Sequence, residues 1–151
     1  MRLCPGFLLA MAPLALARPA GAQSAADTLP ERVVQRAYQA FNRADAAAFY
    51  SFFAPLWYHS VMEDSSLAAT RRTREDAARE LAKWWATGGS RPAVRMLHRI
   101  VVGPYVVDEQ AVMLPGSRDL HLDIFEVRHG KIVHEWESGS DPASHSAPPG
   151  H

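Results

Sequence analysis

The sequence predicts an α+β fold in which three N-terminal helices pack on one side of a curved antiparallel sheet. Apolar residues recur at steps of three and four in three stretches between residues 30 and 86, which is typical of amphipathic helices. Stretches typical of strands then follow one another from residue 94 to residue 137, separated by glycine and proline. Helices followed by a run of strands is the order of an α+β domain.

The first 22 residues have the features of a cleaved signal peptide. A positive Arg2 precedes an apolar run at residues 7–17, and Ala20-Gly21-Ala22 provides a small-residue cleavage site. The run is shorter than the roughly 20 residues that span a bilayer. We therefore expect an exported protein, periplasmic or secreted, with no membrane contact after leader removal. A cytosolic protein with a misassigned start, or an uncleaved anchor, is the alternative.

The rest of the chain is expected to form one domain. Its parts are a flexible leader at residues 23–29, the domain at residues 30–138 and a disordered tail at residues 139–151. The single cysteine, Cys4, is lost with the leader, which excludes disulfides and thiol catalysis. Loss of Arg2 and Arg18 reduces 16 basic side chains to 14, against 16 acidic ones. This near-neutral balance gives no electrostatic footprint for nucleic acid.

Each predicted helix begins at a residue whose side chain can accept a hydrogen bond from the backbone; these are Thr28, Asp45 and Thr73. The short second helix is expected to carry Phe49, Phe52 and Phe53 before Pro55 stops it. The third helix runs to about residue 86, and its inward side chains are Ala77, Ala78, Leu81, Trp84 and Trp85.

Strands are predicted at residues 56–62, 94–102, 105–114 and 119–137, the last stretch being two strands joined at His129-Gly130. Residues 63–70 are expected to form a loop over a pocket mouth. Alternation in the last stretch separates two faces: Leu120, Leu122 and Ile124 against Asp119, His121, Asp123, Phe125 and Val127. A face that runs from polar to apolar indicates that its polar end lines a cavity.

Three segments carry a family resemblance. VVQRAYQAFNRADAAAFYSFFAP, TREDAARELAKWW and LDIFEVRHGKIVHEWE resemble the first two helices, the third helix and the late strand pair of SnoaL-like, ketosteroid isomerase-like proteins of the nuclear transport factor 2-like superfamily. The resemblance covers about residues 30–138. It implies a cone-shaped fold whose curved antiparallel sheet and three helices enclose an apolar cavity. It implies no single activity, because the superfamily includes isomerases, dehydratases, epoxide hydrolases, cyclases and non-catalytic modules.

The resemblance transfers only part of the ketosteroid isomerase site. The oxyanion-hole acid of those enzymes aligns with Asp123, their oxyanion tyrosine with Ala37, and their general-base aspartate with a position near Val61. Tyr38 is one residue beyond Ala37 and is expected to point about 100° away on the helix. Since two of the three residue types are missing, steroid isomerisation in that form is not expected.

The candidate catalytic residues are His59 and Asp123. Burial should raise the pKa of Asp123, so that the neutral acid can donate a hydrogen bond to a developing oxyanion. His59 shares its face with the position of the family's base, and strand register can bring it near Asp123, where it would accept a proton. The alternatives are a structural Asp123 bonded to the backbone or a tryptophan N–H, and a His59 bonded to a backbone carbonyl.

Further residues expected to contact a ligand are Tyr38, Trp57, His121, Phe125 and Glu137. The aromatic members of this set are also typical core residues. On the last strand, Glu135 and Glu137 share one face while His134 and Trp136 share the other. The resemblance to the family favours an orientation in which Glu135 and Glu137 face the cavity. The bulk of Trp136 favours the opposite orientation, in which Trp136 is buried, so both stay open.

Two other arrangements are possible by residue type alone. The Asp-Arg-Asp set of epoxide hydrolases is matched by Asp119, Arg118 and Asp123, but the first two are neighbours on opposite faces. His59, His121 and Asp123 could form a metal site with two imidazoles and one carboxylate. No compact ligand spacing supports that reading, and we expect neither a metal nor a cofactor.

The sequence therefore predicts an exported protein that binds a small apolar molecule. If it is an enzyme, it works without a cofactor by acid–base isomerisation, dehydration or hydration. The alternative is a non-catalytic ligand-binding or dimerisation module of the same fold. A charged cavity with a His–Asp contact favours the enzyme, whereas a cavity filled by aromatic side chains favours the module. Because members of this superfamily often dimerise through the sheet face, a homodimer is expected.

Overall fold

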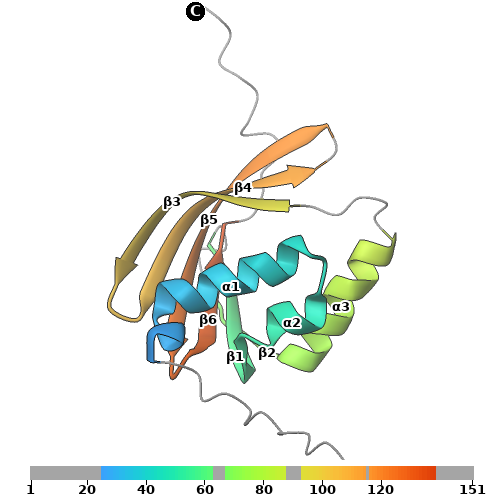
Figure 1. Ribbon diagram of the computed structural model, residues 1–151. Coiled ribbons are helices and arrows are strands. Elements are labelled where there is room, and N and C mark those ends of the chain that lie inside the picture. Colours follow the sequence, from blue (N-terminus) through green and yellow to red (C-terminus); the bar gives the residue numbers. More distant parts are fainter. Residues whose placement is uncertain (1–24, 63–66, 88–92, 115, 139–151) are drawn as a thin grey trace, which may run out of the picture.

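A curved sheet wraps around three helices in the computed structural model, which describes residues 25–62, 67–87, 93–114 and 116–138 (Figure 1). The sheet has six strands in the order β2-β1-β6-β5-β4-β3. All three α-helices lie on its concave side (Figure 1). The predicted α+β class with a curved sheet is confirmed. The predicted signal peptide at residues 1–22 and tail at residues 139–151 lie outside the described residues.

The helices are the 3-10 helix η1 (Ala25–Thr28), α1 (Pro30–Asn42), α2 (Ala46–Tyr50) and α3 (Arg74–Thr87). The strands are β1 (Phe53–Val61), β2 (Thr70–Thr73), β3 (Ala93–Val102), β4 (Tyr105–Leu114), β5 (Ser117–Arg128) and β6 (Lys131–Glu137). In the described part of the chain, the helices fall short of the length and apolar character needed to cross a membrane.

Two of the three predicted helix caps are confirmed. The Asp45 carboxylate accepts a hydrogen bond from the backbone N–H of Ala48, and the Thr73 hydroxyl accepts one from Asp76. The cap predicted at Thr28 is wrong. Leu29 occupies the N-cap position of α1 without a side-chain hydrogen bond, since Thr28 ends the preceding 3-10 helix and Pro30 starts α1 without needing an N–H partner.

Two predicted boundaries change for reasons of tertiary packing. The second helix ends at Tyr50, and Phe53 instead begins β1, where it is fully buried and pairs with Ile132 of β6. Residues 70–73 form β2, antiparallel to β1, where the sequence predicted no strand. Of the loop predicted at residues 63–70, residues 67–69 have no regular secondary structure, residue 70 begins β2, and residues 63–66 lie outside the described residues. Residues 25–28 of the expected flexible leader are helical.

The sheet is antiparallel except where β1 pairs with β6 in parallel. The β5–β6 hairpin turns at His129-Gly130, as predicted, with both residues at positive φ (50° and 70°). This left-handed pair matches the twist of a two-residue hairpin. The parallel pairing brings the end of β6 beside β1, so residues far apart in sequence meet on one concave surface.

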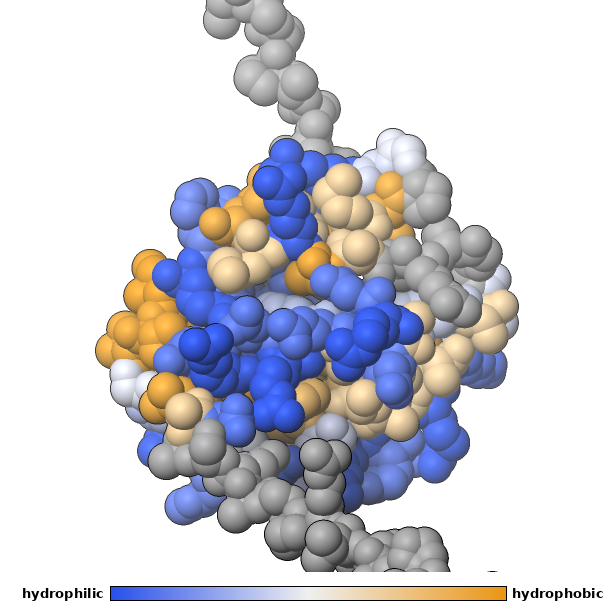
Figure 2. All heavy atoms as spheres, viewed as in Figure 1, coloured by the Kyte–Doolittle hydropathy of each residue, from blue (hydrophilic) through white to orange (hydrophobic). Residues whose placement is uncertain are grey.

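The hydrophobic core lies between the sheet and the helices, and its buried members are Val33, Val34, Ala37, Ala40, Phe49, Phe53, Trp57, Ala77, Val106, Phe125, Val127 and Ile132. α1 presents its apolar face to this core, and the side of the molecule that it covers is largely hydrophilic outside (Figure 2). On α3, Ala77 and Trp85 are buried as predicted, whereas Trp84 is 49% exposed.

A buried ion pair fixes α1 against the sheet. Arg99 of β3 donates two hydrogen bonds, of 2.7 and 2.6 Å, to the carboxylate of Asp108 on β4, whose side chain is fully buried. A third donor of Arg99 contacts the backbone carbonyl of Glu31 at 3.0 Å. The bidentate pairing satisfies both charges, and the contact with Glu31 holds the first turn of α1 in place.

Candidate active site

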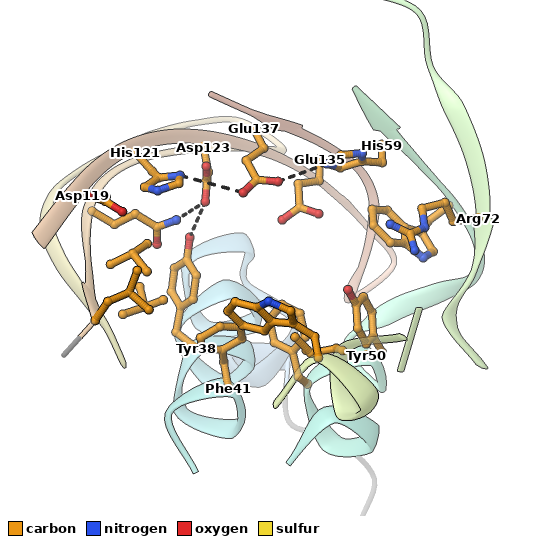
Figure 3. A pocket seen from close by; sticks show the side chains of 18 residues that line it. Tyr38, Phe41, Tyr50, His59, Arg72, Asp119, His121, Asp123, Glu135 and Glu137 are labelled. Atoms are coloured by element: carbon orange, nitrogen blue, oxygen red, sulfur yellow. Dashed lines mark hydrogen bonds and ion pairs between the residues drawn. The ribbon is translucent and has the colours of Figure 1, made fainter. Parts of the chain in front are cut away.

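A cavity of about 390 Å³ opens between the concave face of the sheet and the helices (Figure 3). Its lining residues are Tyr38, Phe41, Phe49, Tyr50, Trp57, His59, Arg72, Leu81, Trp84, Val94, Gln110, Val112, Leu114, Asp119, His121, Asp123, Glu135 and Glu137. The labelled polar side chains His121, Asp123, Glu135 and Glu137 come from the sheet, and Tyr38, Phe41 and Tyr50 face them from the helical side (Figure 3). The cavity thus has a polar wall and an aromatic wall.

The alternation of β5 supplies the first half of the polar wall. Asp119, His121 and Asp123 line the cavity, while Leu120 and Leu122 are about two-fifths exposed on the opposite face. The predicted polar-to-apolar gradient along this strand is therefore a real division between cavity and core. Phe125, predicted as a ligand contact, lies on the core side: it is 1% exposed and packs edge-on against the Tyr38 ring.

The end of β6 supplies the second half of the polar wall. It also shows which face of β6 meets the cavity, a question that the sequence left open. Glu135 and Glu137 line the cavity. His134 and Trp136 occupy the other face, where their rings stack with centroids 3.6 Å apart. The bulk of Trp136 is accommodated by this stacking on the outer face.

Asp123 is the most enclosed acid of the wall. Its side chain is 3% exposed, and its Oδ2 accepts hydrogen bonds from the Tyr38 hydroxyl at 3.4 Å and from the Gln110 amide. Burial, and then the charge of Glu137, raise the pKa of Asp123 from its ordinary 3.8 to about 8. Its Oδ1 is buried without a hydrogen-bond partner in the described structure. The predicted rise in pKa thus has a structural cause.

Tyr38 supplies a hydrogen-bond donor from the helical side. It lines the cavity and contacts Asp123, while Ala37, the position aligned with the oxyanion tyrosine, is buried in the core, so the two side chains point apart on α1 as the helix angle implies. Burial and the nearby Asp123 carboxylate raise the pKa of Tyr38 well above its ordinary range. The phenol therefore keeps its proton and acts as a hydrogen-bond donor.

Glu137 lies between two imidazoles. Its Oε2 is 3.2 Å from His59 Nε2, and its Oε1 is 3.9 Å from His121 Nδ1. The sequence predicted Asp123 as the partner of His59, but the structure pairs His59 with Glu137. The reason is the parallel pairing of β1 with β6, which sets residue 59 opposite residue 135 and next to residue 137. His121 Nδ1 is buried and has no hydrogen-bond partner among the described residues.

Three site residues were not singled out from the sequence as ligand contacts. Gln110 lies on β4 opposite His121, and only strand register places it on Asp123. Glu135 is half-buried in the cavity wall, and desolvation there together with the charges of Glu137 and Asp123 raises its pKa well above the ordinary value. Arg72 belongs to the strand that the sequence did not predict; it lies over the Trp57 ring and pairs with Glu80.

One group of side chains could be considered as metal ligands. His121, Asp123 and Glu137 each offer one ligand atom, and these atoms lie within 4.8 Å of one another. The group contains one imidazole, so it differs from the set of two imidazoles and one carboxylate considered from the sequence, which included His59.

The polar wall can carry out proton transfer. It combines an acid with a raised pKa, a second carboxylate held by an imidazole, and a tyrosine donor around one cavity. Two carboxyl groups whose surroundings differ this much can take opposite roles, one as acid and one as base.

Comparison with known proteins identifies the fold and the family. The SnoaL-like domain family matches residues 34–135, and no curated protein matches the chain. A proposed ketosteroid isomerase from Kribbella flavida is 15% identical with a TM-score of 0.63, covering 82% of this chain and 86% of that one.

Two further structures share the fold. An LEH-like epoxide hydrolase from M. tuberculosis is 18% identical with a TM-score of 0.58, covering 72% of this chain and 80% of its own. IdmH, a proposed polyketide cyclase from Streptomyces antibioticus, is 19% identical with a TM-score of 0.59, and the match covers 76% of this chain and 94% of IdmH. These likenesses show a common fold, and the family match covers most of the described domain. The chain therefore belongs to the SnoaL-like domain family.

Proposed function

We propose that this protein is a cofactor-independent acid–base enzyme acting on a small, largely apolar molecule with a carbonyl or hydroxyl group. The reaction class is isomerisation, dehydration or hydration. The observation that carries the proposal is the placement of a buried Asp123, with a raised pKa and an unpartnered Oδ1, beside the Glu137–His59 pair in one cavity. A charged wall of this kind favours an enzyme over a passive binding module.

Asp123 acts as the hydrogen-bond donor. With a pKa of about 8 it is mainly protonated at neutral pH. Tyr38 and Gln110 both donate to Oδ2, which leaves the proton on Oδ1 and directs it to the ligand. A negative charge that develops on a substrate oxygen is thereby stabilised.

Glu137 acts as the base and His59 positions it. An ionised carboxylate is only an acceptor, so the hydrogen in the 3.2 Å contact belongs to His59 Nε2. That nitrogen is then not free to accept a proton, which moves the role of base from His59, where the sequence placed it, to Glu137. One oxygen of Glu137 and one of Asp123 lie within 4.8 Å. This spacing suits removal of a proton from the carbon beside a carbonyl whose oxygen meets Asp123.

A proton-exchange assay tests this without knowledge of the natural substrate. β-Tetralone is a flat apolar ketone, and enolisation in heavy water replaces its α-hydrogens by deuterium, which NMR detects. We expect exchange above the buffer rate, and about 100-fold or greater loss in Glu137→Gln and in Asp123→Leu. Glu109→Gln, the same change on the outer face of β4, should leave the rate unchanged.

The pH profile is the second readout. Exchange should fall as the pH rises through about 8, because Asp123 then loses the proton that it donates. A wild-type rate equal to the buffer rate for β-tetralone and for smaller cyclic ketones, with the protein folded, would overturn the acid–base proposal. So would an unchanged rate in Glu137→Gln.

We further propose a homodimer formed through the outer face of the sheet. Cross-strand neighbours place Ile100, Val107, Ile124 and Trp136 in one row on this face. Ile100 and Val102 are 61% and 63% exposed, and apolar surface gathers where β3 turns into β4 (Figure 2). Light scattering should give twice the monomer mass for the wild type, and the monomer mass for Ile100→Asp. A monomeric wild type would contradict the proposal.

We also propose export, supported by the signal-peptide pattern of residues 1–22. Expression of the full chain in a Gram-negative host should yield a periplasmic protein that begins at Gln23. Mass spectrometry of the intact protein checks this, and a product that keeps residues 1–22 in the cytoplasm would refute it.

A further inference from the structure

Acidic side chains outnumber basic ones in the lining of the cavity. Four carboxylates line it: Asp119, Asp123, Glu135 and Glu137. The one guanidinium among the lining residues, Arg72, already pairs with Glu80 of α3. The remaining basic groups of the lining are the imidazoles of His59 and His121.

Two of the four, Asp119 and Glu135, have no ion pair or hydrogen bond within the described residues. The side chain of Glu135 lies in the wall beside Glu137 and Asp123. Asp123 Oδ1, which is buried, also lacks a hydrogen-bond partner in the described structure and belongs to the same wall. Polar groups that line a cavity without protein partners are available to a ligand, and the unpaired carboxyl groups of Asp119 and Glu135 favour one that offers hydrogen-bond donors and positive charge.

The opposite wall fits the same kind of ligand. Tyr38, Phe41 and Tyr50 face the carboxylates of Glu135 and Glu137 across the cavity (Figure 3). Aromatic rings attract cations through their negative faces and also accept flat apolar groups. Carboxylates on one side and aromatic rings on the other form a site for an organic cation.

We propose that the ligand of this cavity is an amine, in which a protonated nitrogen is carried on a flat apolar skeleton. The ammonium group lies against Glu135, next to the catalytic carboxylate of Glu137, and the skeleton lies against the aromatic wall formed by Tyr38, Phe41 and Tyr50. The inference names the substrate class of the proposed enzyme and rests on that function for its catalytic meaning. Binding itself requires only the cavity.

A set of three shape-matched probes tests the charge preference. Naphthylmethylamine is a cation at neutral pH, naphthylmethanol is neutral, and naphthoate is an anion. Titration calorimetry should show the amine binding about tenfold or more tighter than the alcohol, with naphthoate weakest. Equal affinities of amine and alcohol would overturn the inference but leave the acid–base function standing. Absence of binding by all three probes would count against the apolar ligand of both proposals.

Variants identify the carboxylate that binds the ammonium group. Glu135→Gln should lower the affinity for the amine about tenfold and leave that for the alcohol unchanged. Glu109→Gln, on the outer face, is the matched control and should change neither. If the amine still binds more tightly than the alcohol by the same factor in Glu135→Gln and in Glu137→Gln, the cation binds elsewhere and the proposed site is wrong. The wild-type comparison of the three probes stands even where a variant fails to fold.

Discussion

Asp123→Asn should make the protein more stable at mildly alkaline pH. Asparagine keeps a carbonyl oxygen for the Tyr38 and Gln110 hydrogen bonds and stays neutral at every pH. Asp123 has its folded-state pKa raised from 3.8 to about 8. Between these values the folded state binds one more proton than the unfolded state, so the free energy of unfolding falls as the pH rises through this window.

The size of this effect follows from the same pKa shift. About four pKa units at about 1.4 kcal/mol each set an upper limit of about 6 kcal/mol on the destabilisation by Asp123. The true value is smaller, because water reaches Glu137, whose side chain is 44% exposed, and screens the repulsion between the Glu137 and Asp123 carboxylates. The new amide N–H groups also need partners in a buried place, at a cost of about 1–3 kcal/mol. We expect a net gain of about 2 kcal/mol at about pH 8 for Asp123→Asn.

Urea denaturation followed by tryptophan fluorescence measures the effect. The free energy of unfolding of wild type and variant should differ little or favour the wild type near pH 4, and should increasingly favour the variant up to about pH 8. Removing Asp123 also removes a charge that raises the pKa of Glu135, which acts in the same direction. A difference that is constant over this range, or that shifts toward the wild type, would refute the account of Asp123.

Three further predictions concern the scaffold, each measured by urea denaturation. Arg99→Met should cost about 3 kcal/mol or more, because it leaves the fully buried Asp108 charge uncompensated; loss of less than about 1 kcal/mol would contradict that role. Thr73→Ala should cost about 1 kcal/mol through loss of the α3 cap, whereas Thr73→Ser should restore most of it. Gly130→Ala should cost about 1 kcal/mol or more, since φ is +70° and the new Cβ would lie 3.1 Å from Cγ2 of Thr28; a neutral effect would show that the turn adjusts.

Most of the fold could be predicted because the sequence patterns that indicate its helices and strands are local. Helical periodicity gave α1 and α3, alternation gave β3 to β6, and the His129-Gly130 turn fixed their last hairpin. β2 escaped prediction because its four residues, TRRT, are polar and become a strand only by pairing with β1. The boundary of α2 moved because Phe53 gains more by entering the sheet than by extending a helix of five residues.

The candidate site was predictable in composition and not in its contacts. Alternation along β5 selected Asp119, His121 and Asp123, since parity is a property of each strand alone. On β6 it grouped Glu135 with Glu137 but left open which face of the strand meets the cavity. The pairing of His59 with Glu137 depends on the parallel register between β1 and β6, for which the sequence carries no local signal. The contact of Tyr38 with Asp123 likewise depends on how α1 crosses the sheet, so the helix angle alone could not predict it.

The parallel pairing of β1 with β6 also determines when the site can exist. His59 and Glu137 are 78 residues apart, so their contact closes a long loop, whereas the β5–β6 hairpin closes a short one. Non-local closure of this kind slows folding, and a nascent chain that lacks β6 leaves edges of β1 and β5 unpaired. The acidic wall therefore depends on pairing between the two ends of the domain, and a ligand that bridges it would hold those ends together.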